Sequence, residues 1–403
     1  MRYFFIFGNH PSLSSAETYA ILGDARICFE QYGAIVESEQ TIDLAELQGR
    51  LGGVVKCGVV LGQTSRETLG DDLYERVKNA ASSGKKFSFG ISAYGARVDT
   101  ARLGLSLKKR LKSEGMASRF VTSKNSTLSS VVVKTNKLLT DRGVEFILLQ
   151  AGGVILLGET SAVQTFAEFS ALDYGRPARD AKSGMIPPKL ARMMINLACL
   201  PADRHGLPTG MARVPNNGII LDPFCGSGTI LQEVLLMGYR NIVGADVSEK
   251  AIDDTKINLA WLGQNAPDAK HSAVRLILSD VRSLSQTLHP QSVDAIITEP
   301  YLGPPLTGKE SERDARMIIG ELERLYESAF RSFHQIIKNR GVVVIIFPII
   351  RGLRLTLPSR FSSLNFAPDH SFASFYDDKS RGSFVYERRG QKIRREIFIL
   401  QKQ

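Results

Sequence analysis

The feature that most constrains the fold is a regular alternation of apolar strands and helical patterns after residue 218. Strands are predicted at 219–221, 242–245, 274–278, 295–298 and 342–347, and helices at 229–237, 249–262 and 312–337. Strands that alternate with helices pair mainly in parallel, with helices on both faces of the sheet. Two further apolar runs, 384–386 and 397–400, flank a glycine-containing turn and predict an antiparallel hairpin. This part of the chain is therefore predicted to be an α/β domain.

The first 180 residues predict further domains, because a chain of 403 residues is too long for one compact core. A strand at 2–7, a helix that begins near Ser14 and a strand at 54–61 predict a small α/β module up to about residue 62. Helices at 72–81 and 103–113, with strands at 87–92, 131–134, 146–150 and 154–158, continue the pattern to about residue 170. The stretch 173–180 is rich in Gly, Pro and charge, which is typical of a linker. Pro187 and Pro188 then suit the first turn of a helix.

Composition limits the partners and the chemistry. The net charge of +10 and the pI near 9.4 favour encounters with a polyanion such as nucleic acid, without naming one. The longest apolar run, 341–350, contains Pro348 and is about half as long as a membrane-spanning helix requires, so it predicts a buried strand. The apolar start is too short for a signal-peptide core, and we expect a cytoplasmic protein.

The histidines and cysteines lack metal-ligand spacing, so no metal site is predicted. The cysteines are expected to be small core residues: Cys28, Cys57, Cys199 and Cys225.

A glycine-rich turn at 222–229 ends one predicted strand and opens the next helix. Its glycines let a ligand approach the backbone, and the helix N-terminus offers free N–H groups. The next two strands end in Asp246 and Asp280, whose carboxylates are placed to meet a ribose and an adenine amino group, respectively. Single aspartates at strand ends are often only helix caps, and nicotinamide and flavin enzymes also use glycine-rich turns. The turn lacks the Gly-x-Gly-x-x-Gly spacing of dinucleotide-binding enzymes, which argues against a nicotinamide or flavin site. The turn followed in order by the two aspartates favours a site for another nucleoside.

The fourth strand ends in Thr298-Glu299-Pro300-Tyr301. In methyltransferases that act on amino groups, Asp or Asn followed by Pro-Pro-Tyr occupies this position. A side-chain oxygen and a backbone carbonyl accept hydrogen bonds from the target –NH2 while the ring stacks on the base, so catalysis is mainly positioning and electrostatics. Aligned without a gap, Thr298 takes the acidic position; with a one-residue deletion, Glu299 does. We favour Glu299, which alone carries a carboxylate. The alternative is that these residues form an ordinary strand-ending turn.

Together these stretches resemble the tRNA (guanine-N2-)-methyltransferases that carry an N-terminal THUMP domain and modify guanosine 10. The resemblance rests on DYGRPARD at 173–180, GMIPPKLA at 184–191, DPFCGSGT at 222–229 and REI at 395–397, and it covers nearly the whole chain. It implies a ferredoxin-like module at 1–62, a THUMP RNA-binding domain at 63–170, a linker at 171–186 and a methyltransferase domain at 187–403. The last is expected to be a Rossmann-like class I domain with a mostly parallel seven-stranded sheet and an antiparallel terminal hairpin.

The resemblance also implies an activity, a cofactor and site residues. We expect transfer of a methyl group from S-adenosylmethionine to a tRNA guanine, which forms N2-methylguanosine or N2,N2-dimethylguanosine. Family members often need a small zinc-binding activator subunit. The expected catalytic residues are Glu299, Pro300, Tyr301 and Thr298. The expected cofactor residues are Asp222, Phe224, Gly226, Gly228, Thr229, Asp246, Val247, Ser279, Asp280 and Pro187. The expected tRNA-binding residues are Lys108, Lys109, Arg110, Lys112, Arg119 and Lys124.

Several alternatives stay open at this point. The basic helix around 103–113 is also compatible with a solvated helix face that binds nothing. One alternative is an enzyme with the same chemistry whose target is another tRNA guanosine or a ribosomal RNA guanosine. A second is a non-catalytic RNA-binding relative that has lost its catalytic acceptor. A DNA adenine methyltransferase shares the amino-group motif, although the N-terminal half and the linker argue against it.

Overall fold

The computed structural model describes residues 1–23, 25–81, 87–179, 185–198, 214, 217–266, 274–388 and 390–403. Part of the predicted linker, at 180–184, and the residues Cys199 and Arg389 lie outside this range. The described chain divides into two compact units. Unit 1 contains the described residues within 1–11 and 24–167, and unit 2 contains those within 12–23 and 168–403. Among the described residues, no helix has the length and apolarity that crossing a membrane requires.

Unit 1 is built on one nine-stranded sheet, in the order β2-β3-β1-β4-β9-β8-β5-β6, with β7 paired to β8. Its strands are β1 (Arg2–Phe7), β2 (Arg26–Glu30), β3 (Gly33–Glu37), β4 (Val54–Thr64), β5 (Phe87–Tyr94), β6 (Ser118–Val121), β7 (Leu139–Thr140), β8 (Gly143–Ala151) and β9 (Val154–Val163). Its described helices are α2 (Leu44–Arg50), α3 (Leu69–Ala80), α4 (Thr100–Ser113) and α5 (Ser130–Thr135). The predicted boundary after residue 62 falls inside β4, which pairs with β1 and with β9.

Two predictions for unit 1 are wrong. The run Val131–Lys134, predicted as a strand, lies within helix α5. The Ser129 hydroxyl caps that helix by accepting the Val132 backbone N–H at 3.3 Å, and this local cap outweighs the strand preference of three consecutive valines. Cys28, expected in the core, is exposed on β2.

A buried ion pair lies within the sheet of unit 1. The ammonium of Lys56 on β4 contacts the carboxylate of Glu145 on β8, and both side chains are at most 1% exposed. The hydroxyls of Ser92 and Thr160 donate to the same carboxylate at 2.6 and 2.8 Å. A buried charge is tolerated only when it is paired and hydrogen-bonded, and both conditions are met here.

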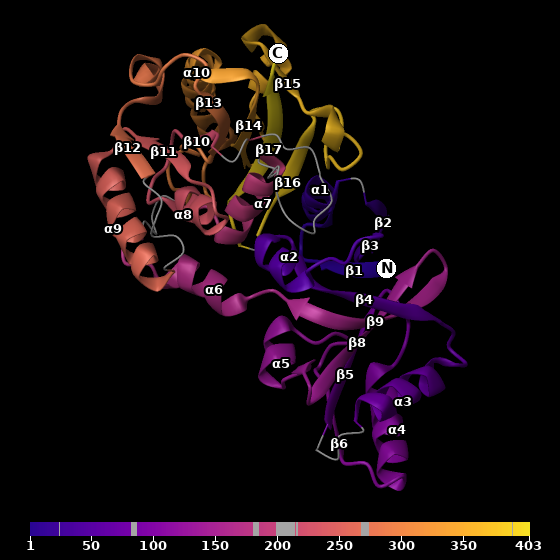
Figure 1. Ribbon diagram of the computed structural model, residues 1–403. Coiled ribbons are helices and arrows are strands. Elements are labelled where there is room, and N and C mark those ends of the chain that lie inside the picture. Colours follow the sequence, from indigo (N-terminus) through magenta and orange to yellow (C-terminus); the bar gives the residue numbers. More distant parts are fainter. Residues whose placement is uncertain are drawn as a thin grey trace. The chain divides into compact units, whose positions relative to one another are not determined.

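Unit 2 contains an eight-stranded sheet in the order β12-β11-β10-β13-β14-β17-β15, with β16 also paired to β17 (Figure 1). Its strands are β10 (Ile219–Asp222), β11 (Asn241–Asp246), β12 (Val274–Leu278), β13 (Val293–Thr298), β14 (Ile337–Ile350), β15 (Phe366–Pro368), β16 (Ser383–Tyr386) and β17 (Ile393–Lys402). The predicted parallel strands and the β16–β17 hairpin are confirmed. The prediction of seven strands is wrong because β15 and β16 pair with successive parts of β17.

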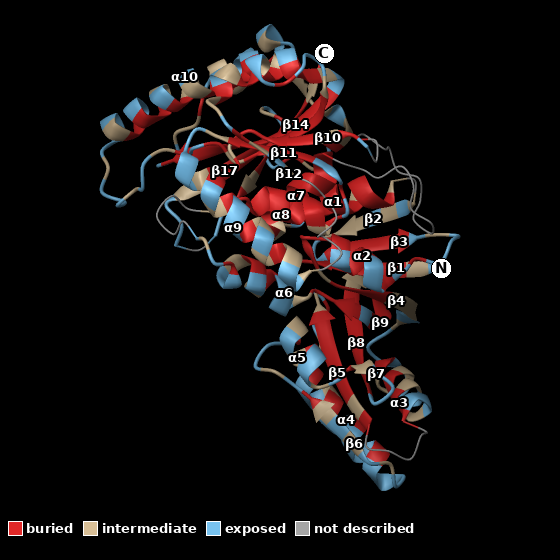
Figure 2. Cartoon of the chain, turned by 60° about the vertical axis from the view of Figure 1, so that its left-hand side comes forward, coloured by how far each residue is buried: buried red, intermediate tan, exposed pale blue. Residues whose placement is uncertain are grey.

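Helices cover both faces of this sheet. They include α7 (Pro188–Ala198), α8 (Thr229–Leu236), α9 (Glu249–Asn265) and α10 (Glu312–Ile336). Neighbouring strand residues alternate between two cores: Ile220 packs with α7 and α8, whereas Leu221 packs with α10. Figure 2 shows the result: the buried strands lie between α7 and α8, which are themselves almost entirely buried, and α10, whose outer face is exposed. This is a doubly wound, Rossmann-like sheet.

The first helix of the chain, α1 (Pro11–Leu22), belongs to unit 2. It begins three residues before the predicted start, because a proline fits the first helical position. Leu13, Ala16 and Ala20 join the same core as α7. Buried Glu17 accepts a hydrogen bond of 2.7 Å from Asn196 on α7. A segment that the sequence places in the N-terminal module therefore completes the core of unit 2.

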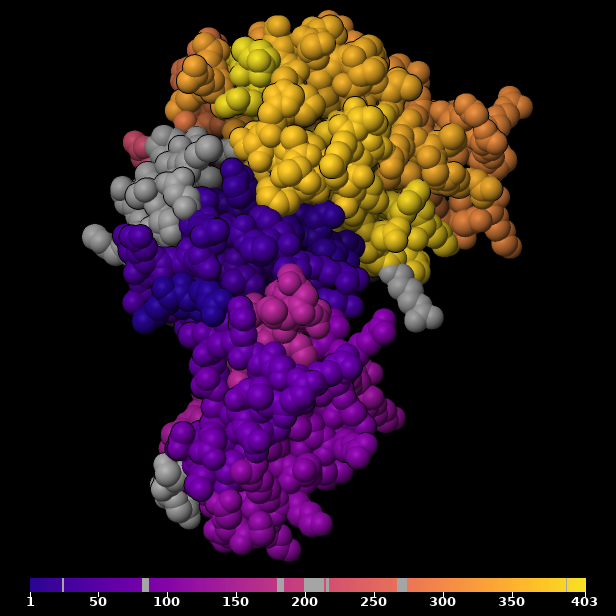
Figure 3. All heavy atoms as spheres, turned by 90° about the vertical axis from the view of Figure 1, so that its right-hand side faces the viewer, coloured from indigo at the N-terminus to yellow at the C-terminus, as the bar shows by residue number. Residues whose placement is uncertain are grey.

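Strand β17 lies inside the sheet of unit 2. It pairs with β14 along nine residue pairs, from Val342 opposite Gln401 to Ile350 opposite Ile393. In Figure 3, the yellow C-terminal residues accordingly lie directly against the orange residues that precede them. The C-terminal segment is thus an integral part of the sheet.

Candidate active site

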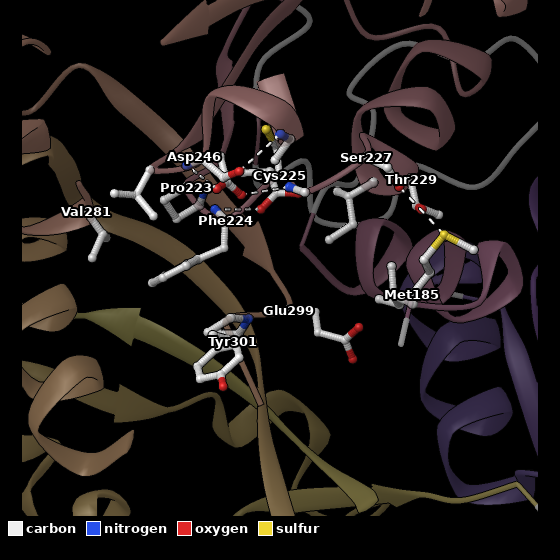
Figure 4. A pocket seen from close by; sticks show the side chains of 18 of the residues that line it. Met185, Pro223, Phe224, Cys225, Ser227, Thr229, Asp246, Val281, Glu299 and Tyr301 are labelled. Carbon is white, nitrogen blue, oxygen red and sulfur yellow. Dashed lines mark hydrogen bonds between the residues drawn. The ribbon is translucent and has the colours of Figure 1, made fainter. Parts of the chain in front are cut away.

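A cavity of about 470 Å³ lies in unit 2 at the carboxyl ends of the parallel strands (Figure 4). The sheet order reverses at β10, since β11 and β12 follow on one side while β13 and β14 follow on the other. Open α/β sheets bind ligands at such a reversal, and the volume falls within the roughly 300–1,000 Å³ of small-molecule sites. The predicted residues that line the cavity are Asp222, Phe224, Gly226, Thr229, Asp246, Val247, Asp280, Glu299, Pro300 and Tyr301. Those that do not line it are Pro187, Gly228, Ser279 and Thr298.

The glycine turn between β10 and α8 has the backbone conformation that its glycines permit. Gly226 and Gly228 adopt φ values of 51° and 84°, in the left-handed region that other residues rarely enter. A Cβ atom at Gly228 would lie 3.0 Å from the Thr255 side chain, whereas one at Gly226 would meet open space. The turn therefore presents bare backbone to the cavity, with Thr229 as the first residue of α8.

Asp246, at the end of β11, is tied to that turn. Its Oδ2 accepts the Gly226 backbone N–H at 3.0 Å, and its Oδ1 accepts the Ser248 N–H at 2.9 Å. The next residue, Val247, is 69% exposed, although it is apolar. A half-buried carboxylate next to an exposed apolar surface suits a sugar and a planar base, respectively.

Asp280 differs from what the sequence predicts. It caps the short 3₁₀-helix η3 (Val281–Gln286), and its carboxylate accepts hydrogen bonds from both the backbone and the guanidinium of Arg282. These hydrogen bonds lower the pKa of Asp280. The hydroxyl of Ser279 donates to the Asp280 carbonyl at 3.1 Å. The predicted adenine acceptor is thus at the cavity edge, but it is already paired with an arginine.

Asp222 and Thr298 form a buried pair at the base of the cavity. The Thr298 side chain is fully buried, and its hydroxyl donates to Asp222 Oδ1 at 2.8 Å. The Phe224 backbone N–H donates to the same oxygen at 3.2 Å. Burial raises the pKa of Asp222 to about 7, although these hydrogen bonds oppose the shift. Thr298 therefore supports Asp222 and does not line the cavity, contrary to its predicted catalytic role.

Glu299 and Tyr301 extend from the end of β13 toward the cavity (Figure 4). The Glu299 side chain is 9% exposed, and its Oε1 accepts a hydrogen bond of 2.6 Å from Arg395 Nε. Burial raises the pKa of Glu299, and the Arg395 charge opposes that shift. Tyr301 is 53% exposed, while its backbone carbonyl accepts a 2.7 Å hydrogen bond from the Tyr326 hydroxyl. The segment thus presents a fixed carboxylate and an accessible ring.

Sequence reasoning missed several residues of the site, among them Met185, Ile186 and Arg176. Met185 and Ile186 line the cavity just before α7. Arg176 is 2% exposed and donates to the Thr229 hydroxyl at 2.5 Å, and among the described residues its Nε has no hydrogen-bond partner. Arg176 and Met185 lie within the quoted stretches DYGRPARD and GMIPPKLA, but a residue pattern alone does not show that Arg176 contacts both Met185 and Thr229.

The predicted tRNA-binding residues all lie on the surface of unit 1. Lys108, Lys109 and Lys112 are exposed on α4, Arg119 is exposed on the edge strand β6, and Lys124 follows it. Arg110 is also exposed, but it is paired with Asp71 at 2.6 Å, and its guanidinium lies 3.5 Å from the centre of the Tyr74 ring.

The basic residues of the β16–β17 turn are engaged within the chain. Lys392 donates to the backbone carbonyls of Leu306 and Thr307, and Arg388 donates to the Tyr386 hydroxyl. Arg395 is buried against Glu299. The turn therefore braces the loop that follows Tyr301 and is not a simple cationic surface.

Comparisons with known proteins agree with this geometry. A family described as "Methyltransferase domain" matches residues 216–350, and one described as "DNA methylase" matches residues 168–257. The tRNA (guanine(10)-N2)-dimethyltransferase of Methanothermobacter thermautotrophicus is 28% identical over 363 residues, which are 88% of this chain and 90% of that protein. The protein of the same name from Methanocaldococcus jannaschii is 32% identical over 165 residues, 41% of this chain and 38% of that one.

The crystal structure of TrmN from Thermus thermophilus resembles the fold over the full length of both chains, with a TM-score of 0.56 and 15% identity. At that identity the likeness concerns the fold alone. The sheet order and the position of the cavity give unit 2 a Rossmann-like class I fold, and residues 216–350 of this unit match the methyltransferase domain family. Over most of its length, the chain is a homologue of proteins named tRNA (guanine(10)-N2)-dimethyltransferase.

Proposed function

We propose that this protein is an S-adenosylmethionine-dependent tRNA (guanine-N2-)-methyltransferase that acts on guanosine 10 and forms N2-methylguanosine or N2,N2-dimethylguanosine. The observation that carries the proposal is that the Glu299 carboxylate and the exposed Tyr301 ring enter the cavity that also contains Asp222 and Asp246. The relatives named tRNA (guanine(10)-N2)-dimethyltransferase support the choice of substrate and position.

The chemistry of the cavity fits S-adenosylmethionine, which supplies an electrophilic methyl group on a positively charged sulfur. Asp246 would hold the ribose hydroxyls, and Val247 would pack against the adenine. The N-terminus of α8 and Thr229 would bind the amino-acid carboxylate, because helix N-termini attract anions. The carboxylates of Asp222 and Glu299 give the cavity the negative charge that a sulfonium requires.

The target amino group is conjugated to the guanine ring, so it reacts only when its lone pair points at the methyl group. Glu299 and the backbone carbonyl of Pro300 would accept its two hydrogen bonds while Tyr301 stacks on the base. Fixed acceptors of this kind lower the barrier by orientation and electrostatics, without a covalent nucleophile. A guanine in a folded tRNA helix must first be turned out of its stack.

We assign tRNA binding to unit 1, with a ferredoxin-like module at 1–62 and a THUMP domain at 63–170. The support is the resemblance of the chain together with the exposed cations of α4 and β6. Lys108, Lys109, Lys112, Arg119 and Lys124 form no ion pair with another residue that the structure describes, so they are available to phosphates. Arg110 is the exception, because Asp71 already neutralises it. A small zinc-binding activator subunit remains part of the proposal.

The test is to incubate the purified protein with labelled S-adenosylmethionine and an unmodified tRNA transcript, and to locate the methyl groups by nucleoside mass spectrometry. We expect N2-methylated guanosine at position 10 and none in a transcript with adenosine at that position. Glu299→Ala should lower kcat roughly 10²–10³-fold, the usual effect of losing one transition-state hydrogen-bond partner, with little change in affinity for S-adenosylhomocysteine. Methylation at another position, or equal turnover by Glu299→Ala, would contradict the proposal.

The match to the family described as DNA methylase calls for one further comparison. It covers the linker and the glycine turn but not residues 299–301, which would face the target amino group. Methylation of duplex DNA should therefore be absent at the salt concentration at which tRNA is methylated, because binding to any polyanion depends strongly on salt.

A further inference from the structure

The site contains a second charged residue that the proposed chemistry has not used: Arg395 on β17. It is 4% exposed, and its guanidinium is held at three points. Nε lies 2.6 Å from Glu299 Oε1, one terminal nitrogen lies 3.5 Å from Glu299 Oε2, and the other donates to Gln391 at 2.9 Å. A buried guanidinium fixed in this way is a rigid hydrogen-bond donor.

The sheet explains how a residue 96 positions away in the sequence reaches Glu299. Strand β13 ends at Thr298, which pairs with Ile345 of β14, but β14 continues to Ile350. Arg395 pairs with Pro348, so β17 passes beyond the end of β13 together with β14. The Arg395 side chain therefore stands beside the first residue after β13, which is Glu299.

The two carboxylate oxygens of Glu299 differ in their surroundings. Oε1 is held by the short contact to Arg395 Nε, whereas the contact at Oε2 is at the limit of a hydrogen bond. Each carboxylate oxygen can accept two hydrogen bonds, so Oε2 keeps its accepting capacity. Glu299 is at the same time part of the cavity lining.

We propose that Arg395 is a positioning residue: it anchors Oε1 of Glu299 and thereby presents Oε2 to the target amino group. This inference rests on the proposed function and adds a residue from the C-terminal hairpin to its machinery. It also explains how a longer glutamate serves where other amino-group methyltransferases have Asp or Asn, because the arginine fixes the longer side chain.

The pairing also has a consequence for the pH dependence. Burial raises the pKa of Glu299, and Arg395 is the cation that opposes this effect. The other ionisable groups that interact with Glu299 are Asp222 at the end of β10, whose charge opposes ionisation, and the Tyr326 phenol on α10. Without Arg395, the carboxylate should take up a proton at a higher pH, and its accepting oxygen would then be lost at neutral pH.

The experiment compares wild type, Arg395→Met, Arg395→Lys, Glu299→Gln and the double variant Glu299→Gln with Arg395→Met. The first readouts are kcat as a function of pH and the affinity for S-adenosylhomocysteine. We expect Arg395→Met to lower kcat at pH 7 about tenfold or more, the effect expected for a hydrogen bond to a charged group, and to recover part of it at higher pH. Arg395→Lys should keep more activity, and cofactor affinity should not change.

Glu299→Gln provides the sharpest distinction. In that variant Arg395 would hold the only side-chain oxygen, so the amide –NH2 would face the target –NH2 and activity would fall. Replacing Arg395 as well frees the amide to turn its oxygen toward the substrate. The double variant should therefore be several-fold more active than Glu299→Gln alone, although Arg395→Met by itself is harmful. A purely structural arginine does not produce this reversal of sign.

The outcomes separate the two levels of the proposal. If wild-type protein does not methylate a guanine amino group, the proposed function fails. If wild type is active but Arg395→Met retains its kcat and pH profile, only the role of Arg395 fails. A double variant less active than both single variants would also overturn that role. The double variant contains neither of the two charges, so this test remains possible if Arg395→Met folds poorly.

Discussion

Asp222 offers a quantitative test of the energetics at the base of the cavity. Burial raises its pKa to about 7 from an ordinary value of 3.8. Between these values, the folded protein keeps a proton on Asp222 that the unfolded chain has lost. The folded state therefore binds more protons, so this group makes stability fall as pH rises from about 4 to 7, with no further change above that range.

The substitution Asp222→Asn removes this pH-dependent contribution to stability and keeps the size and shape of the side chain. Both hydrogen bonds to Asp222, from Thr298 and from the Phe224 backbone, end on Oδ1, and the amide oxygen of asparagine can accept both. A pKa difference of about three units corresponds to about 4 kcal/mol at roughly 1.4 kcal/mol per unit. At pH 8 the variant should therefore be more stable than wild type by up to about 4 kcal/mol, and at pH 4 the two should be nearly equal.

The assay is urea unfolding of the ligand-free protein from pH 4 to pH 8. The single tryptophan of the chain, Trp261 on α9, packs against the core of unit 2, so its fluorescence reports on the unit that contains Asp222. Only the difference between variant and wild type is used, because the other groups titrate in both proteins. Parallel stability curves for Asp222→Asn and wild type would refute the reasoning.

Three further predictions concern other parts of the molecule. Glu145→Gln removes the charge that neutralises buried Lys56 and should destabilise unit 1 by about 3–5 kcal/mol. The loss should appear as faster amide hydrogen exchange in β4 and β8, and unchanged exchange would show that the ion pair is dispensable. Gly228→Ala places an alanine in the left-handed conformation within the glycine turn, close to Thr255, and should weaken S-adenosylhomocysteine binding measured by calorimetry. Gly238→Ala is the control, because Gly238 has a similar φ but lies in open space outside the cavity. It should lower stability without changing affinity. Arg176→Met should weaken S-adenosylhomocysteine binding roughly tenfold or more, because Arg176 holds Thr229 at the proposed site of the ligand's amino-acid carboxylate. The affinity for 5′-methylthioadenosine, which has no carboxylate, should not change. Equal losses of affinity for both ligands would contradict this role of Arg176.

The sheet of unit 2 could be predicted because its physical determinants are local. The period of apolar residues fixes each strand, the glycines fix the turn, and the order of strands fixes which ends meet at the cavity. The run around Val131 was mispredicted for the opposite reason: strand preference is weak and depends on context, whereas the cap from Ser129 is a specific hydrogen bond. Local rules therefore succeed where no competing contact exists.

The state of each site residue could not be predicted, since it depends on partners that are distant in the sequence or compete locally. Whether Thr298 or Glu299 faces the cavity follows from Asp222 and Arg395, which come from two other strands. Asp280 lies two residues after the end of β12, at the edge of the cavity, yet its neighbour Arg282 occupies its carboxylate. A charge pattern shows which groups are present, and only the folded arrangement shows which of them are already satisfied.

The position of α1 in unit 2 has a consequence for how the protein is made. This helix lies at residues 11–22, whereas β17, which runs through the sheet of the same unit, ends at Lys402. At roughly 5–20 residues per second, a ribosome needs about 20–80 seconds to synthesise the intervening chain. During the first part of that time the apolar face formed by Leu13, Ala16 and Ala20 has no native partner, because α7 and the other elements of its core are made later. The apolar face of α1 therefore stays without its core until α7 has been synthesised, and the core is filled only when β17 follows.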